Sequence, residues 1–450
     1  MATSDHALVN PNPNDLFEFL SDNPDVRFIR LQWLDYTNLL RCRVVPRKCV
    51  GQLVKECYTV EAGSLTSLEE AEAGPQRIPT EAVGQAHLIA DWASLRLCPW
   101  APGHASVQCY FGKEEEGNHL VDEICPRFAL LKADNQVLGV LIGFKIEFRV
   151  SERDKSGQAC SLVETHSASS IDTLEQRMLP VMDEIVKCVE SAGDTIFGYH
   201  AGDQRDQYNI ITYDAPPLIA ADTLVFIRQV VRNVCKKHSL VPTFDQSPTD
   251  EELGSVYVPS RVHINISLNT VGLRLEESIL AGILEHLNAI FAFGLPLPMS
   301  YERVVASQRE FGRFEAWGTH NREVPIQKMG PASWKLRCVD ASANIYLVLA
   351  AVITSAEAGM KGKTKLTVKD CQVDPETLSK EDRKHLGITR KLPHEVKAAH
   401  SFLKVDQLLN DALGSVLVEK YLRVMATFAD VLNNGCMYEN EQRELLCTRL

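Results

Sequence analysis

Two segments near the middle of the chain alternate strictly between apolar and polar residues. The first covers residues 144–150, and its polar positions are Lys145, Glu147 and Arg149. The second covers residues 262–268, and its polar positions are His263, Asn265 and Ser267. Because successive side chains of a β-strand point to opposite faces, the alternation predicts two strands that each have one apolar and one polar face. The polar faces are either solvated or, if both line one cavity, form the floor of a binding site.

The first quarter of the chain also has strand patterns. A short helix carrying Leu16 and Leu20, which Asn14 can cap, precedes them. Residues 27–33 and 39–45 alternate on either side of a turn at 35–38, which predicts a hairpin. Short strands return over residues 87–110, and the charged, glycine-flanked stretch 112–117 is typical of a linker. We therefore predict a helical segment over residues 1–24, a β domain over 25–111 and a larger domain over 118–450.

The larger predicted domain combines strands with helices. Apolar residues recur at helical spacing in residues 172–191, 222–238, 276–293 and 341–358, and residues 402–433 predict two further helices. Strands and helices in this order, without an internal repeat, predict an α+β fold.

Composition and charge narrow the partners and the compartment. The chain has 450 residues, of which 45% are hydrophobic and 24% charged, as in ordinary globular proteins. Its net charge of -12 disfavours nucleic acid as a partner, and no stretch approaches the roughly 20 apolar residues that span a bilayer. The 13 cysteines are scattered without a CxxC pair, and the first residues lack an apolar leader. These features predict reduced thiols and a cytoplasmic protein without a membrane partner.

A series of short motifs, each weak alone, stands in the order of one enzyme family. They are residues 30–46, 95–103, 143–148, 206–222, 300–303, 321–322 and 337–347. Together they resemble the type I glutamine synthetase family of bacteria and fungi. The resemblance implies an N-terminal β-grasp domain followed by a glutamine synthetase-type catalytic domain, in which helices flank a curved antiparallel sheet. It also implies a homo-oligomeric ring in which neighbouring subunits share sites.

The resemblance further implies a defined chemistry. Such enzymes use ATP to phosphorylate the side-chain carboxylate of glutamate, and ammonia then displaces the phosphate. Two Mg²⁺ or Mn²⁺ ions, held by five glutamates and one histidine, neutralise the developing charge. In this sequence the six ligand positions fall on Lys145, Glu147, Ala201, Asn209, His263 and Lys335. Only Glu147 and His263 keep a ligand of the family's type.

The two lysines argue against metal binding in the family manner. A charged lysine has no free lone pair, so it cannot ligate a metal ion. At about 4 Å and an effective dielectric of about 20, an ammonium group repels a divalent ion by about 8 kcal/mol. One glutamate or one histidine does not offset this repulsion. We therefore predict that neither metal ion binds as it does in the family.

Other positions keep residues that suit anions. Arg303, Arg322 and Arg337 match arginines that bind the substrate carboxylate or the phosphates in the family. Asn209 and Asn265 are further candidates for substrate binding. Glu310 falls near the family's mobile catalytic glutamate, with a match that needs a shift of one residue.

Three hypotheses about function follow. In the first, Lys145 and Lys335 replace ligands of the same ion, so their ammonium groups converge beside Glu147 and His263 in a metal-free pocket. This pocket takes a small carboxylate or phosphate, and its residues either only bind it or perform acid–base catalysis without ATP.

The second hypothesis is an amide or γ-glutamyl ligase that depends on ATP with Mg²⁺ or Mn²⁺. The third is a pseudoenzyme with an assembly or regulatory role. Fungal relatives of this kind act in development and specialised metabolism. We therefore expect a role in a biosynthetic pathway, which the residues do not identify.

Overall fold

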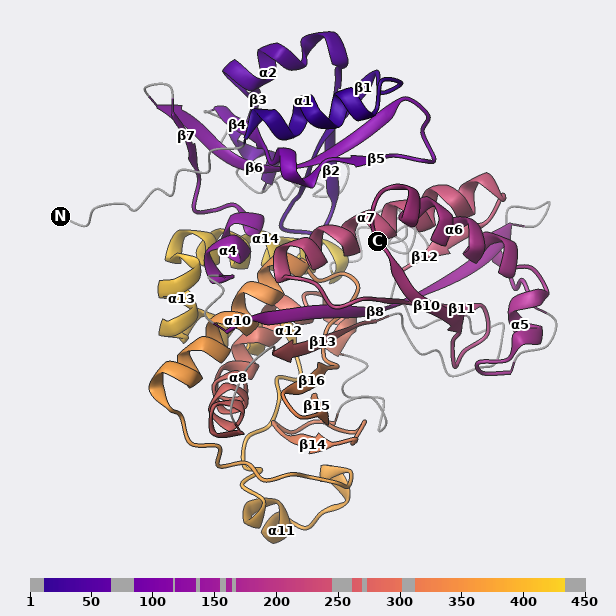
Figure 1. Cartoon of the computed structure of the whole chain (residues 1–450). Coiled ribbons are helices and arrows are strands. Elements are labelled where there is room, and N and C mark those ends of the chain that lie inside the picture. Colours follow the sequence, from indigo (N-terminus) through magenta and orange to yellow (C-terminus); the bar gives the residue numbers. More distant parts are fainter. Residues whose placement is uncertain are drawn as a thin grey trace.

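The computed structural model describes residues 12–65, 85–115, 118–134, 138–153, 159–163, 167–244, 261–268, 273–301 and 312–433. Two β-sheets and a layer of helices make up this part of the chain (Figure 1). The N-terminal sheet lies above α4 and α7 in the view of Figure 1, and the second sheet lies below them. This mixture of helix and sheet confirms the predicted α+β fold class.

The N-terminal sheet has seven strands in the order β2-β1-β6-β4-β3, and β5 and β7 also pair with β6. The pairing of β1 with β6 is parallel, and the others are antiparallel. Helices α1 and α2 belong to this part of the molecule. The elements are α1 (Pro13–Asp22), β1 (Phe28–Leu34), β2 (Leu40–Pro46), α2 (Val50–Glu56), β3 (Tyr58–Glu61), β4 (Gln85–Ala90), β5 (Arg96–Leu97), β6 (His104–Glu115) and β7 (Asn118–Val121).

The second sheet has nine strands in the order β10-β11-β8-β13-β16-β15-β14, and β9 and β12 also pair with β8. All of its pairings are antiparallel except that of β14 with β15. Its strands are β8 (Val140–Arg153), β9 (Ala159–Cys160), β10 (Ile196–Ala201), β11 (Gln207–Thr212), β12 (Val241–Thr243), β13 (Val262–Leu268), β14 (Trp317–Thr319), β15 (Ile326–Gly330) and β16 (Ser333–Leu336).

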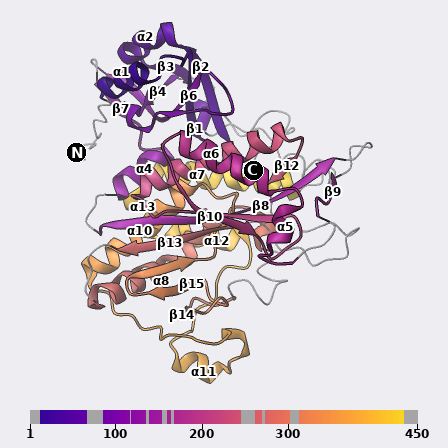
Figure 2. The same cartoon turned by 45° about the vertical axis from the view of Figure 1, so that its right-hand side comes forward.

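Helices bury the apolar face of this sheet. Phe144, Ile146 and Phe148 of β8 are fully buried in one core with residues of α7, α8 and α10. The turned view shows α7 running between the N-terminal sheet and β8 (Figure 2). The helices are α4 (Pro126–Ala133), α5 (Ile171–Glu175), α6 (Leu179–Ser191), α7 (Pro217–Lys237), α8 (Leu273–Gly294), α10 (Ile345–Gly362), α11 (Lys380–His385), α12 (Val396–Val405), α13 (Gln407–Leu413) and α14 (Ser415–Asn433).

The closest helix contact in the core is that of α8 with α10. A Cβ atom on Gly282 would lie 2.2 Å from the carbonyl oxygen of Ser355 and 2.7 Å from the Cα of Gly359. Glycine at both positions therefore lets the two backbones touch. By length and composition α10 could cross a membrane, although no stretch of this kind was expected from the sequence. In the structure, however, 67% of this helix is buried inside the protein. It is the central helix of the core.

The turn of the β1–β2 hairpin fastens the two sheets together. Asn38, whose φ of 67° is left-handed, donates from Nδ2 to the carbonyl of Ala341 at 2.9 Å. Asn344, which caps α10, donates from Nδ2 to the carbonyl of Asp35, also at 2.9 Å. The turn predicted at 35–38 therefore also orients the N-terminal sheet on the larger part of the chain.

Several predicted boundaries were wrong for local reasons. Asn12, not Asn14, caps α1, because Pro13 takes the first helical position. Residues 112–115 belong to β6, which pairs with β7, so the N-terminal sheet includes part of the predicted linker and extends to Val121. The helix predicted over 172–191 is divided into α5 and α6, because Pro180 favours the start of a new helix. The last two predicted helices are three, α12, α13 and α14.

Candidate functional site

The register of the nine-stranded sheet brings most of the predicted site residues to one face. Asn209 of β11 is opposite Glu147 of β8, and His263 of β13 is opposite Lys145 of β8. Residues that face each other across antiparallel strands point to the same side of the sheet. Asn265, two positions after His263 on β13, is opposite Lys335 of the neighbouring strand β16. These six side chains therefore share the face opposite the apolar core, which we call the polar face.

Glu147 is the carboxylate at the centre of the polar face. Its Oε1 accepts from Lys145 Nζ at 2.9 Å and lies 3.4 Å from His263 Nε2, and its Oε2 accepts from Gln207 Nε2 at 3.4 Å. Burial alone would raise the pKa of Glu147. The hydrogen bond from His263 and the charges of Lys145 and Arg261 instead hold it well below its usual range. Glu147 is therefore ionised at neutral pH.

His263 is neutral at neutral pH. Burial lowers its pKa to about 4, against the opposing effect of Glu147. Its Nε2 faces Glu147, while its buried Nδ1 has no hydrogen-bond partner among the described residues. The same holds for the buried Oδ1 of Asn209. Buried polar atoms normally have partners, so the described part of the polar face presents two hydrogen-bonding atoms without one.

The two lysines differ in their partners. Lys145 pairs with Glu147, whereas Lys335 has no ion pair with any described residue. Burial lowers the pKa of Lys335, and the charges of Lys145, Arg337 and Arg322 lower it further. Lys145 and Lys335 thus lie close enough to repel each other.

Positive charge dominates around these lysines. Burial lowers the pKa of Arg337 to about 10, and the charges of Arg261 and Arg322 act in the same direction. Arg322 itself is exposed. In a chain with a net charge of -12, four cationic side chains therefore interact with the carboxylate of Glu147, and Arg322 interacts with two of them, Lys335 and Arg337. The four are Lys145, Arg261, Lys335 and Arg337.

Sequence reasoning missed two residues of the polar face and misplaced a third. Arg261 directly precedes β13, and its carbonyl accepts from the backbone N–H of Glu147 at 3.0 Å. Gln207 reaches Glu147 from β11. Ala201 was taken as a lost metal ligand, but it pairs with Tyr208 and is buried in the core, on the face opposite Asn209.

His200 is the residue of β10 that lies opposite Asn209. The signal for Arg261 was present in the sequence, because it continues the period of two from His263. Arg303 and Glu310 lie outside the described residues. Asn265 lies near Gly143, where Asp214 covers the strand and accepts from Ser267 Oγ at 2.7 Å.

The side chains of the polar face do not fit a divalent metal ion. Such an ion needs several oxygen ligands, mostly carboxylates. Both oxygens of Glu147 already accept hydrogen bonds, and the donor on Oε1 is the positively charged Lys145 ammonium, which would repel a cation bound there. Within the described ranges, no group of three or more His, Cys, Asp or Glu side chains could hold a metal ion.

Comparisons with known proteins agree on the family. The model of the glutamine synthetase catalytic domain matches residues 123–432. The chain is 32% identical over 461 residues to Protein fluG of Emericella nidulans, which covers 99% of this chain and 52% of fluG. It is 28% identical over 433 residues to the glutamine synthetase of Halobacterium salinarum, covering 88% of each. The chain thus spans about half the length of fluG and most of the length of the synthetase.

The fold has the same relatives. The solved structure described as a GmaS/ADP complex superposes with a TM-score of 0.77 at 19% identity, covering 95% of this chain and 98% of that one. At this identity the likeness concerns the fold alone. With the family model matching most of the chain, the conclusion is direct: the chain belongs to the glutamine synthetase family, as a divergent member whose central carboxylate is paired with a lysine.

Proposed function

We propose that the polar face binds a small molecule bearing a carboxylate or phosphate, without the metal ions of the family. The observation that carries this proposal is Lys335. It is a partly buried cation that has no ion pair with a described residue and is repelled by Lys145, Arg322 and Arg337. An anion bound beside Lys335 would relieve this repulsion and satisfy its donors. Arg322 and Arg337 offer planar forks that match carboxylate and phosphate oxygens.

The same residues would support acid–base chemistry. Glu147 is an ionised carboxylate, and His263 is a neutral imidazole with an unsatisfied Nδ1. A lysine whose pKa is lowered by neighbouring cations releases its proton more readily than a free lysine, so Lys335 suits the role of a base or amine nucleophile. We therefore extend the proposal from anion binding to catalysis without a metal ion on the scaffold of the family.

Ligand-induced thermal stabilisation tests the binding proposal. The protein is scanned with glutamate, succinate and inorganic phosphate, each in the presence of EDTA. We expect at least one anion to raise the Tm, and expect Lys335→Ala and Lys145→Ala to remove the effect. Lys361→Ala is the matched control, because Lys361 is exposed on α10 and pairs with Glu357 of the same helix. If all three variants respond like the wild type, the polar face is not the anion site.

Family membership favours a second candidate, the ATP-dependent ligase. In this candidate ATP and Mg²⁺ or Mn²⁺ act together, and an acid is joined to ammonia or an amine. The pure protein is incubated with ATP, Mn²⁺, glutamate and hydroxylamine, and ADP and hydroxamate are measured. We expect neither product. Hydroxamate formation would overturn the metal-free proposal and establish the ligase.

The remaining predictions concern the setting of the protein. Glutamine synthetases are oligomers that bind small molecules, and for this chain we propose a homo-oligomeric ring with an anionic small-molecule partner. Light scattering of the purified chain tests the ring. A pseudoenzyme role follows if the chain assembles but binds no anion in the thermal screen. Cytoplasmic location and a place in a specialised biosynthetic pathway stay predictions.

A further inference from the structure

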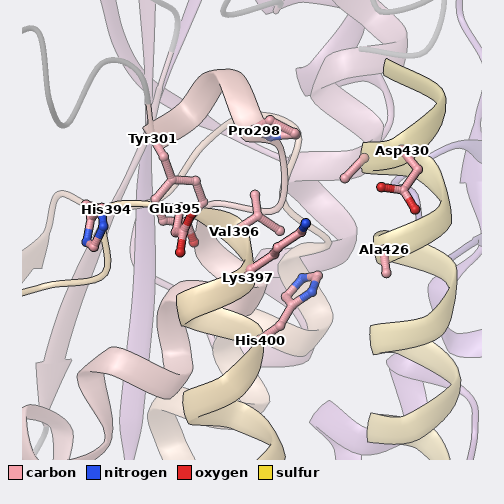
Figure 3. A pocket seen from close by; sticks show the side chains of 10 residues that line it. Pro298, Tyr301, His394, Glu395, Val396, Lys397, His400, Ala426 and Asp430 are labelled. Atoms are coloured by element: carbon pink, nitrogen blue, oxygen red, sulfur yellow. The ribbon is translucent and has the colours of Figure 1, made fainter. Parts of the chain in front are cut away.

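A recess between two C-terminal helices lies apart from the strands that carry the polar face. It has a volume of about 640 Å³ and is formed by α12, α14 and residues that follow α8 (Figure 3). Pro298 and Tyr301 close one end, and the hydroxyl of Tyr301 is engaged, since it donates to the carbonyl of Phe291 at 3.3 Å. Pockets that bind small molecules have volumes in this range.

Small side chains account for the space. α14 presents Ala426 and Ala429 to the recess, and α12 presents Val396. This part of the wall is therefore apolar, and a ligand with an aliphatic part would bury it there.

Five polar side chains line the recess, His394, Glu395, Lys397, His400 and Asp430, and the last three lie between α12 and α14. Figure 3 shows Lys397 and His400 projecting from α12 toward α14, from which Asp430 projects back. Lys397 and Asp430 carry opposite charges, yet within the part of the chain that the structure describes neither has a hydrogen bond or an ion pair. The Lys397 ammonium and the Asp430 carboxylate thus face one another across the recess without forming an ion pair.

His400 distinguishes the recess from an ordinary solvated groove. Exposed charges such as Lys397 and Asp430 need no protein partner, because water satisfies them. The Nε2 of His400, in contrast, is buried and has no hydrogen-bond partner among the described residues. Burial lowers the pKa of His400 to about 4, so at neutral pH the ring is an uncharged hydrogen-bonding group. A turn of the ring would present this nitrogen to a ligand atom in the recess.

We propose that this recess binds a small aliphatic zwitterion, of the size of an amino acid or dipeptide. Its carboxylate pairs with Lys397 and its ammonium group with Asp430, while its aliphatic part lies on Val396 and Ala426. His400 Nε2 completes the set with a hydrogen bond to the ligand. The site uses no residue of the polar face, so it stands independently of the proposed function.

Three related probes test the charges separately. Leucine carries both charges, isoamylamine lacks the carboxylate, and 4-methylpentanoate lacks the ammonium group. We expect isothermal titration to show that leucine binds at least about fivefold more tightly than either analogue, since each charge-assisted contact is worth about 1 kcal/mol or more. Lys397→Gln should lower the affinity for leucine to the affinity that the wild type has for isoamylamine. Asp430→Asn should lower it to the affinity that the wild type has for 4-methylpentanoate.

A steric variant locates the site. Ala426→Phe fills the recess and should abolish leucine binding, whereas Val416→Phe, at an exposed position of α14 outside the recess, should leave it unchanged. Thermal unfolding verifies that both variants fold. Lys335→Ala should also leave leucine binding intact, which separates this site from the polar face. The proposal is overturned if no probe binds, if binding survives Ala426→Phe, or if Lys335→Ala abolishes it.

Discussion

Replacing Lys145 with methionine is the most informative perturbation of the polar face. Methionine keeps an unbranched side chain of similar length and removes only the charge and the donors. In the wild type, Lys145 Nζ lies 2.9 Å from Glu147 Oε1. Glu147 is 7% exposed, so its charge depends on protein partners rather than on water. The variant leaves this carboxylate with His263, Gln207 and Arg261.

The magnitude follows from the geometry. At 2.9 Å and an effective dielectric of about 20, the attraction of the pair is about 6 kcal/mol before the cost of desolvation. Breaking a fully buried pair typically costs about 3–5 kcal/mol. The Lys145 side chain is 24% exposed, and Glu147 keeps its other partners, so the net effect is smaller. We expect the free energy of unfolding to fall by about 2 kcal/mol at neutral pH.

The effect should depend on pH in a defined direction. The folded state holds the pKa of Glu147 below the unfolded value of about 4.5, so this group stabilises the fold above that pH. The stabilisation is lost as the pH falls through the folded-state pKa. Without Lys145 the folded-state pKa moves up toward the ordinary value. The difference between variant and wild type is therefore largest near neutral pH and shrinks in acid.

Urea unfolding followed by tryptophan fluorescence, at neutral and at acidic pH, measures both quantities. Lys361→Met is the control, because the Lys361 side chain is 63% exposed and its pair with Glu357 should contribute less than about 1 kcal/mol. The interpretation of Glu147 as an ion held by Lys145 fails if Lys145→Met is as stable as the wild type. It also fails if the loss of stability is the same at both pH values.

Three further predictions test other parts of the molecule. The double variant Lys145→Glu/Lys335→Glu places carboxylates at two positions that the resemblance predicts to be metal ligands. We expect Mn²⁺ to raise the Tm of this variant but not that of the wild type in scanning fluorimetry. Arg228 is 6% exposed, has no hydrogen bond or ion pair with a described residue and is repelled by Arg232. Arg228→Met should therefore raise the free energy of unfolding by about 1–3 kcal/mol in urea, and a loss would contradict this. Gly282→Ala should lower it by about 3 kcal/mol through the clash with the Ser355 carbonyl, whereas Gly51→Ala, which meets no atom within 4 Å, should not.

The polar face could be predicted because its signal is local. Strict alternation placed Lys145 and Glu147 on one side of a strand and His263 and Asn265 on one side of another, and both strands adopt that pattern. What alternation does not contain is the pairing between strands. Gln207 and Glu147 meet only because β11 lies beside β8, and the sequence between them gives no sign of it.

Ala201 shows where a family resemblance does not place a side chain. The resemblance puts a lost ligand on Ala201, which requires that the turn between β10 and β11 keeps Ala201 and Asn209 on one face. Here the register pairs Ala201 with Tyr208, which turns the methyl group into the core and gives the polar face to His200. Helix boundaries failed similarly at Pro180, because periodicity alone does not locate the end of a helix.

Under the proposed function, the charge balance allows a scaffold of the glutamine synthetase family to hold an anion without metal ions. Two lysine ammonium groups supply together the charge of one divalent ion, but they are tethered, so their presence does not depend on metal concentration. Glu147 pairs with Lys145, which leaves Lys335 for a ligand. Binding to such fixed surface-accessible charge weakens as salt screens it, over a distance of about 10 Å at 0.1 M. Under the proposed function, affinity for the anion is therefore insensitive to EDTA and falls with rising ionic strength. The affinity of a metal-bridged ligand would fall on addition of EDTA as well as with rising ionic strength.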